Sequence, residues 1–296
     1  MRTKRYLAAV AATALAATSL VACSSETDSS ASNGDGDSVT VKIGTTDADQ
    51  KAWSVFADEA QKAGIDLDIM RFTEYPQVNP AQVEGQIEIS KFQTINYQAQ
   101  YNATAGEDLR IIGSGEINIL GLYWKDHDSL DGIEGTEVAI PNDPSNQGRA
   151  INVLVQAGLL TLSDNVADEL APTPSDIDKD ASKVTVTPVD ASQTPNAYNE
   201  GRPAIINNTW LDRAGIEPGL AVFQDDPESK EAEPYINVFA ARAEDIDDET
   251  LNKLVELWQT PEVAEAAAKD SKGTSVPVYR EKSELNDILD RLQNKN

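Results

Sequence analysis

The residues best suited to bind a ligand lie in the segment 138–149, which reads VAIPNDPSNQGR. A short apolar run predicts a strand that ends in a Pro/Asn/Asp turn, and Ser145 and Asn146 are both suitable N-cap residues for a following helix. Arg149 would then lie in the first helical turn, where free N–H groups and the helix dipole favour an anion. A guanidinium can bind a carboxylate through two parallel hydrogen bonds. The spacing therefore predicts a carboxylate site, and an arginine that pairs with a structural aspartate is the alternative it leaves open.

The reactive side chains of the sequence give little support for a catalytic function. The one histidine, His127, lies in the polar run KDHD, and no metal-ligand or triad spacing accompanies it. The sequence has neither a glycine-rich phosphate loop nor a GxSxG nucleophile motif. Carboxylates are so frequent that their spacing carries no information. We therefore expect no enzyme, no catalytic residue, no metal site and no cofactor.

Charge and length restrict the partners. The 296 residues carry a formal net charge of −26, which disfavours nucleic acid and anionic bilayers as partners of the general surface. The expected partners are small molecules or proteins, and an anionic ligand group would need a local cation. The length allows one large domain or two medium domains with hydrophobic cores.

The N-terminal residues have the pattern of an export signal. A basic start precedes the apolar stretch 6–22, and the sequence LVAC ends at Cys23, the only cysteine. This pattern resembles a bacterial lipoprotein signal, which implies cleavage before Cys23 and lipidation of its sulfur. A buried cysteine after a transmembrane helix is the alternative, but the apolar run is short for a span. We expect residues 1–22 to be the signal peptide and 23–38 to be the lipidated cysteine with a flexible polar tether.

Strand and helix patterns alternate after the tether. Val39, Val41 and Ile43 alternate with polar residues, as in a half-buried strand. Asp47, followed by Gln50, resembles a capping box for the next helix. Further strands are expected at 67–72, 111–117 and 120–124, and apolar helix faces at 53–60, 151–155, 251–258 and 285–292. The alternation indicates an α/β protein with mostly parallel sheets.

Several motifs together resemble those of one protein family. The segment Asn142–Arg149 resembles the NDPxNxGR motif of the methionine-binding lipoproteins, or NlpA family, the substrate-binding proteins of methionine ABC importers. Other matches follow in the family's order: FTEY at 72–75 with NPA at 79–81, GQIE at 85–88 with FQ at 92–93, AIINNT at 204–209 and PYIN at 234–237. The resemblance extends from Val39 to about Lys269.

The resemblance implies a two-lobed type II periplasmic-binding-protein fold, of the α/β class, with the ligand in a cleft between the lobes. The chain would cross between the lobes near 118–123 and 234–238. Lobe 1 would then comprise residues 39–118 plus 238–296, and lobe 2 residues 119–237. A hinge between the lobes would let the ligand complete contacts from both sides.

The family motifs also imply a role for each matching residue. Arg149 would bind the carboxylate of an amino acid, and Asn207 and Asn237 would hydrogen-bond its ammonium and carboxylate groups. Tyr75 and Phe92 would form aromatic walls for the side chain, where a thioether gains from ring contact. Without the motifs, the asparagines would be interpreted as turn or strand-end residues and the aromatic residues as ordinary core.

Three departures from the family pattern fall around the expected side-chain pocket. Thr94 replaces a histidine, NYQ at 96–98 replaces Pro-Tyr-Leu, and Asn118 with the following isoleucine replaces Tyr-Pro. We therefore add Thr94 and Asn118 to the predicted ligand-binding residues and expect a more polar pocket. The predicted ligand is an α-amino acid, methionine or a relative. A different polar amino acid, a methionine derivative or a small peptide is the alternative.

Membership of this family would also define the protein partners. The chain would deliver its ligand to an ABC permease and its ATPase, while the lipid anchor held it on the extracytoplasmic face of the cell membrane. A surface lipoprotein with an adhesive or signalling role is the second functional class. A bound small molecule would favour transport, and a filled cleft beside an exposed apolar patch would favour the second class.

Overall fold

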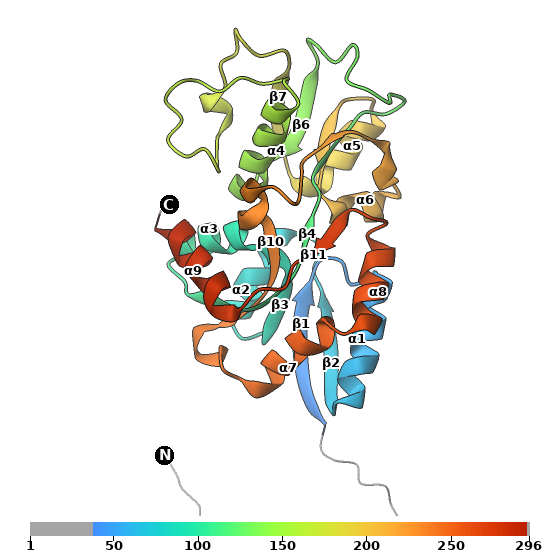
Figure 1. The fold of residues 1–296 in the computed structure, drawn as a ribbon, viewed down its shortest axis with the longest axis vertical. Coiled ribbons are helices and arrows are strands. Elements are labelled where there is room, and N and C mark those ends of the chain that lie inside the picture. The colour runs from blue at the N-terminus through green and yellow to red at the C-terminus, as the bar shows by residue number, and fades with distance from the viewer. Residues whose placement is uncertain (1–37, 295–296) are drawn as a thin grey trace, which may run out of the picture. The chain divides into compact units, whose positions relative to one another are not determined.

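The computed structural model describes residues 38–294 of the chain. They belong to a compact unit, Asp37–Asn296, which is coloured in Figure 1. The predicted signal peptide (1–22), Cys23 and all but the last residue of the predicted tether (23–38) lie outside the described residues. Within residues 38–294, no helix has both the length and the apolar character that crossing a membrane requires.

A six-stranded sheet forms the lower part of the unit in Figure 1. Its strands are β1 (Val39–Thr45), β2 (Ile65–Arg71), β3 (Ile89–Thr94), β4 (Leu109–Asn118), β10 (Ile236–Arg242) and β11 (Ser275–Pro277). The strand order is β11-β4-β10-β3-β1-β2. β1 pairs in parallel with β2 and β3, whereas β10 is antiparallel to β3 and β4, and β11 is antiparallel to β4.

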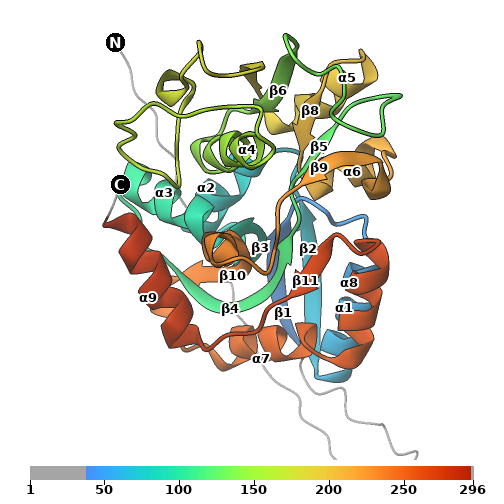
Figure 2. The same ribbon diagram turned by 45° about the horizontal axis from the view of Figure 1, so that its top comes forward.

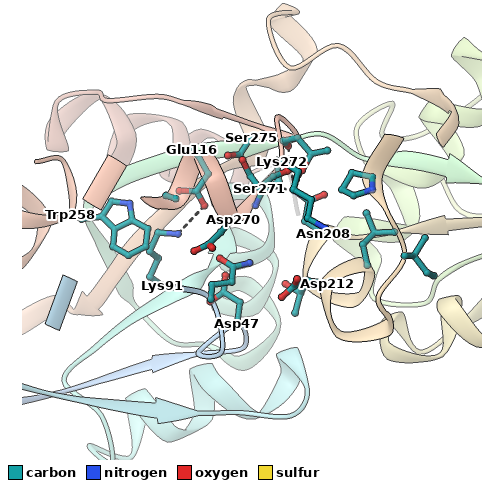
Figure 3. A pocket seen from close by; sticks show the side chains of 18 residues that line it. Asp47, Lys91, Glu116, Asn208, Asp212, Trp258, Asp270, Ser271, Lys272 and Ser275 are labelled. Carbon is teal, nitrogen blue, oxygen red and sulfur yellow. Dashed lines mark hydrogen bonds and ion pairs between the residues drawn. The ribbon is translucent and has the colours of Figure 1, made fainter. Parts of the chain in front are cut away.

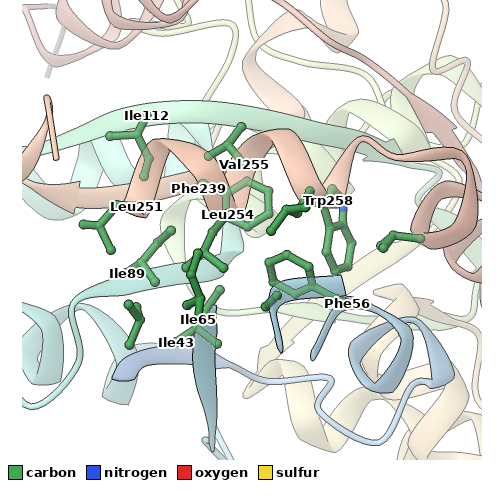
Figure 4. Close-up of a cluster of buried hydrophobic side chains, with 14 of the residues drawn as sticks. Ile43, Phe56, Ile65, Ile89, Ile112, Phe239, Leu251, Leu254, Val255 and Trp258 are labelled. Atoms are coloured by element: carbon green, nitrogen blue, oxygen red, sulfur yellow. The ribbon is translucent and has the colours of Figure 1, made fainter. Parts of the chain in front are cut away.

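Helices cover both faces of this sheet. They are α1 (Lys51–Lys62), α2 (Val78–Val83), α3 (Ile95–Ala105), α7 (Glu249–Trp258), α8 (Pro261–Asp270) and α9 (Lys282–Gln293). The apolar sides of α1, α7 and α8 bury one face, where Phe56, Phe239 and Trp258 meet (Figure 4). The rings of Phe56 and Trp258 pack edge to face with centroids 5.3 Å apart. Helices α3 and α9 bury the other face. On the first face, α1 comes from the start of the described residues and α7 and α8 from near their end, so distant parts of the sequence complete that core.

A second, five-stranded sheet forms the other part. Its strands are β5 (Gly121–Tyr123), β6 (Glu137–Pro141), β7 (Thr185–Val189), β8 (Ala204–Ile206) and β9 (Ala221–Gln224), in the order β7-β6-β8-β5-β9. Its helices are α4 (Pro144–Gln156), α5 (Thr194–Asn199) and α6 (Asn208–Ala214). Val138 and Ile140 point to α4, and Ala139 points to α5 and α6, because side chains alternate between the faces of a strand. Figure 2 shows α4 end-on above the elements of the first sheet.

The chain passes between the two sheets twice. β4 ends at Asn118 in the first sheet, and β5 begins at Gly121 in the second. β9 ends at Gln224, and the chain returns through the 3-10 helix η5 (Lys230–Tyr235) into β10. The predicted two-lobed α/β architecture is thus confirmed, while the proposed extent of each lobe stays a prediction.

The expectation of mostly parallel sheets is wrong. In the first sheet, β1, β3 and β4 run towards the crossing points, whereas β10 starts at a crossing and must run away from it. In the second sheet, β5 starts at a crossing and is antiparallel to β8 and β9. The two passages between the sheets therefore produce mixed sheets.

The predicted capping box at α1 is also wrong. Gln50 occupies the N-cap position without a side-chain cap bond. The carboxylate of Asp47 instead accepts a hydrogen bond from the indole Nε1 of Trp53 at 2.9 Å. Asp47 therefore fixes a core tryptophan at the edge of the pocket described below.

Candidate ligand-binding site

All seven predicted ligand-binding residues line one pocket between the two sheets. They are Tyr75, Phe92, Thr94, Asn118, Arg149, Asn207 and Asn237. Each lies at or near the end of a strand or at the start of a helix, and they come from both sides of the cleft. Five of them lie in five separate motifs, and Thr94 and Asn118 are departures from the family pattern; the structure brings all seven together.

The helix that carries Arg149 begins earlier than the sequence analysis predicts. Asp143 is its N-cap, and its Oδ1 accepts a hydrogen bond from the backbone N–H of Asn146 at 2.9 Å. Pro144 occupies the first helical position, where its missing N–H costs nothing. Ser145 and Asn146 are thus inside the helix, and Arg149 lies in its second turn. The predicted first-turn position of Arg149 is wrong for this reason.

Arg149 connects the two segments that cross between the sheets. Its Nε donates to Oδ2 of Asp225 at 2.8 Å, and its Nη2 donates to the carbonyl oxygen of Asn118 at 2.7 Å. Its guanidinium carbon lies 4.4 Å from the ring centroid of Tyr235. Burial raises the pKa of Tyr235 to about 12, so this ring is neutral at physiological pH. Asp225 also accepts from the backbone N–H of Leu120 at 2.8 Å.

The geometry confirms the structural interpretation of Arg149, while its binding of a ligand carboxylate stays a prediction. The side chain is 5% exposed and pairs with a carboxylate at 2.7 Å, as the structural interpretation requires. It also lines the pocket, and its bonds to Asp225 and Asn118 use Nε and Nη2. The remaining amino group, Nη1, is not used in these bonds.

Aromatic rings form one wall of the pocket. Tyr75, from the 3-10 helix η1 (Tyr75–Gln77), lies with its ring centroid 6.2 Å from that of Phe92 and 5.2 Å from that of Trp210. Tyr97 adds an edge-to-face contact with Phe92 at 5.8 Å. Burial raises the pKa of both tyrosines, so this wall is uncharged.

Amides and a hydroxyl also line the pocket. The Nδ2 of Asn207 donates to Oδ1 of Asn146 at 2.8 Å, and the buried Oδ1 of Asn207 has no hydrogen-bond partner among residues 38–294. Asn237 lies opposite Thr94 in the antiparallel pairing of β10 with β3, so both side chains are on the same face of the sheet. The hydroxyl of Thr94 accepts from the backbone N–H of Tyr97 at 3.2 Å and caps α3.

Asn118 links the two parts of the molecule and lines the pocket. It ends β4, its carbonyl group binds Arg149, and its Oδ1 accepts from Nδ2 of Asn208 at 3.3 Å. Asn208 also donates to the hydroxyl of Thr274 at 2.9 Å. The side chain of Asn118 therefore contacts an element of the second sheet at the point where the chain leaves the first.

A buried ion pair separates this pocket from a second one. The Nζ of Lys91 lies 2.8 Å from Oε1 of Glu116 and 4.4 Å from the ring centroid of Trp258. Lys91 and Glu116 line both pockets, together with Asp47, Asn118, Asn208 and Thr209. Figure 3 shows this pair beside Asp47 and Asp270 in the second pocket. The wall shared by the two pockets is thus polar and carries both signs of charge.

Some residues of the site were missed by the sequence analysis. Asn146 lies inside the NDPxNxGR match, Tyr97 lies in the NYQ segment that departs from the family pattern, and Lys91 directly precedes Phe92 of the FQ match. Each of these features was visible in the sequence. Glu116 had no comparable signal, because acidic residues are frequent throughout the chain.

Two α/β lobes joined by two crossings, with a polar and aromatic cleft between them, define a substrate-binding protein of the periplasmic-binding class. The chain belongs to the NlpA lipoprotein family, whose model matches residues 41–279. This family consists of substrate-binding proteins of transporters and not of enzymes.

Known proteins resemble the chain over most of its length. The D-methionine-binding lipoprotein MetQ of Escherichia coli is 32% identical over 242 residues, which is 80% of this chain and 87% of that protein. The crystal structure of protein PG110 from Staphylococcus aureus has a TM-score of 0.80 and 34% identity, covering 85% of this chain and 99% of that one. A nutrient binding protein from Burkholderia cenocepacia bound to methionine has a TM-score of 0.74 and 30% identity, covering 80% and 99%.

Proposed function

We propose that this chain is the membrane-anchored substrate-binding lipoprotein of an ABC importer. It captures an α-amino acid, methionine or a relative, in the cleft and delivers it to the permease and its partner ATPase. Lipidation of Cys23 holds it at the extracytoplasmic face of the cell membrane. The lobes that close on the ligand comprise residues 39–118 with 238–296 and residues 119–237.

The observation that carries this proposal is the convergence of the seven predicted ligand-binding residues in one pocket. An α-amino acid has a carboxylate and an ammonium on one carbon, and the pocket offers a guanidinium, Arg149, and an acceptor, Oδ1 of Asn207. The relatives whose names give a ligand bind methionine, and the aromatic wall suits a thioether.

The charges of the pocket also suit a zwitterion. Arg149 is paired with Asp225, and Lys91 is paired with Glu116. Because the charges already in the pocket are paired, a ligand with a large net charge would bury a charge of its own without a partner, which is costly. A zwitterionic amino acid adds one charge of each sign, so the balance is retained.

A second candidate ligand is longer or more polar than methionine. The adjoining pocket shares its wall with the first and contributes further carboxylates, including Asp212 and Asp270. Thr94 and Asn118 also occupy positions where the family pattern has other residues. A polar amino acid, a methionine derivative or a small peptide could extend into this space.

Calorimetric titration tests the proposal. The chain from Ser24 onward contains every described residue and all four buried apolar clusters, and it should be unfolded and refolded to remove carried ligand. We expect saturable heat with L- or D-methionine that Arg149→Ala removes. Heat with glutamine or a dipeptide, and none with methionine, would support the second candidate. No heat with any of them, and no small molecule in native mass spectra of the unrefolded protein, would favour an adhesive or signalling role.

A further inference from the structure

Three polar side chains form a hydrogen-bonded row that ends in the ligand pocket. The carboxylate of Asp143 accepts from Nδ2 of Asn146 at 3.0 Å through Oδ1 and at 3.1 Å through Oδ2. Oδ1 of Asn146 accepts from Nδ2 of Asn207 at 2.8 Å. Oδ1 of Asn207 is buried and has no partner within residues 38–294.

The carboxylate of Asp143 alone determines how both amides of this row are oriented. An ionised carboxylate only accepts hydrogen bonds, so the amide of Asn146 must turn its NH₂ group to Asp143. Its oxygen then faces Asn207, which must turn its own NH₂ group back to Asn146. The oxygen of Asn207 is thereby left for the pocket, where it can only accept. Without the carboxylate, each amide could be reversed.

We propose that Asp143 is a positioning residue that fixes Asn207 as a hydrogen-bond acceptor, so that the pocket selects ligands with a cationic amino group. This inference depends on the proposed function, because it assigns the selectivity of the same site. Asp143 does not line the pocket itself and acts through Asn146, which does. It also carries the negative charge that favours an ammonium at the end of the row.

The surroundings of Asp143 make its charge state sensitive to pH. Burial raises the pKa of its carboxyl to about 6, although the bonds from Asn146 lower it. The phenols of Tyr75 in η1 and Tyr97 in α3 interact electrostatically with the Asp143 carboxylate. Burial raises the pKa of both phenols. These neighbours are therefore neutral between pH 4 and pH 8, and Asp143 is the group of this row that titrates there.

The variant Asp143→Asn separates the two roles of the residue. Asparagine is as good an N-cap as aspartate, so α4 should begin as before. Its amide offers a donor as well as an acceptor, so the row can run in either direction. Asp248→Asn is the matched control, because Asp248 caps α7 through the backbone N–H of Leu251 at 2.9 Å and does not line the pocket.

Two ligands distinguish positioning from a general structural effect. L-Methionine has the ammonium, and 4-(methylsulfanyl)butanoate is the same molecule without it. In Asp143→Asn we expect the affinity for L-methionine to fall roughly 10- to 100-fold, as for one lost hydrogen bond to a charged group. The affinity for the analogue should stay within about 3-fold, since it does not use Asn207 as an acceptor. An equal loss for both ligands, or the same loss in Asp248→Asn, would overturn the proposal.

An NMR titration tests the row without any ligand. The side-chain ¹⁵NH₂ signals of Asn146 and Asn207, assigned from their alanine variants, should shift together with one midpoint near the pKa of Asp143. Asp143→Asn should abolish the shift at both, and Asn146→Ala should abolish it at Asn207. If the Asn207 signal changed neither with pH nor in either variant, the proposed hydrogen-bonded row would be disproved. If the row titrates but the wild type binds neither ligand, the proposed function has failed for methionine while the positioning role of Asp143 stands.

Discussion

The two walls of the cleft are built on different physical principles. The aromatic wall, around Tyr75 and Phe92, consists of rings that meet at centroid distances of 5.2 to 6.2 Å and at varied angles. The polar wall, around Arg149 and Asn207, consists of hydrogen bonds of 2.7 to 2.8 Å, and each has one allowed direction.

This difference indicates which wall sets ligand identity. Apolar contact is non-directional and tolerates modest changes of shape, so the aromatic wall can accept related side chains. A buried donor or acceptor that loses its partner costs roughly 1–3 kcal/mol. The polar wall should therefore recognise the amino-acid backbone, and the aromatic wall should rank side chains by size.

The largest effect is expected from Arg149→Ala. It removes the cation of the polar wall and leaves Asp225, whose side chain is 11% exposed, without its partner. Loss of one member of a buried pair costs roughly 3–5 kcal/mol of stability, and binding of an amino acid should fall below detection. Chemical denaturation and calorimetry measure the two effects.

Arg202→Ala is the matched control for that experiment. Arg202 is 39% exposed and pairs with Glu137 and Glu200 at the surface of the same part of the molecule. Its loss should cost less than about 1 kcal/mol and leave affinity unchanged. If Arg149→Ala retained wild-type affinity, the polar wall would not be the recognition wall.

A smaller effect is expected from Phe92→Ala in the aromatic wall. Phe92 is partly exposed to the pocket and contacts Tyr75 and Tyr97. Removing the ring should weaken methionine binding about 10-fold, through lost apolar contact, and the loss should shrink for alanine as ligand. Phe223→Ala, in the core of the second part, controls for stability loss alone. If Phe92→Ala weakened methionine binding as much as Arg149→Ala, the two walls would not have separate roles in recognition.

The sequence predicted these residues better than it predicted their arrangement. The motifs identified five side chains that line one pocket, because a motif holds residue types at fixed spacing, and the departures from the motifs identified Thr94 and Asn118. The partners that orient them are distant in sequence: Asp225 for Arg149 and Asn146 for Asn207. No spacing rule predicts such pairs before the fold is known. The start of α4 was misplaced since Asp143, Ser145 and Asn146 are all competent N-caps, and Pro144 decides among them.

Thr94→His restores the family residue and should have a modest effect on stability. The hydroxyl of Thr94 caps α3 by accepting from Tyr97, and histidine is a poor N-cap. We expect a loss of about 1 kcal/mol, measured by denaturation, while Thr94→Ser should retain the cap. A more stable histidine variant would show that the departure serves ligand choice and not the helix.

The smallest effect is a pH dependence of stability that has the opposite sign to that of most carboxylates. In the folded chain the pKa of Asp143 is raised to about 6 from 3.8, so between these values the folded state binds more protons than the unfolded state. Stability from this group is therefore present below the lower value and is lost as pH rises through about 6. Because Asp143 is partly exposed, the change should be a few tenths to about 1 kcal/mol.

The measurement is the difference in unfolding free energy between wild type and Asp143→Asn from pH 4 to pH 7.5, since the variant cannot titrate there. The wild type should gain relative to the variant as the pH falls, while its affinity for an amino acid should decline over the same range. The partly buried site favours a neutral Asp143, but a neutral Asp143 no longer fixes the amides of the polar wall. If stability and affinity changed in the same direction with pH, the carboxylate would be a simple helix cap, and the polar wall would owe its direction to another group.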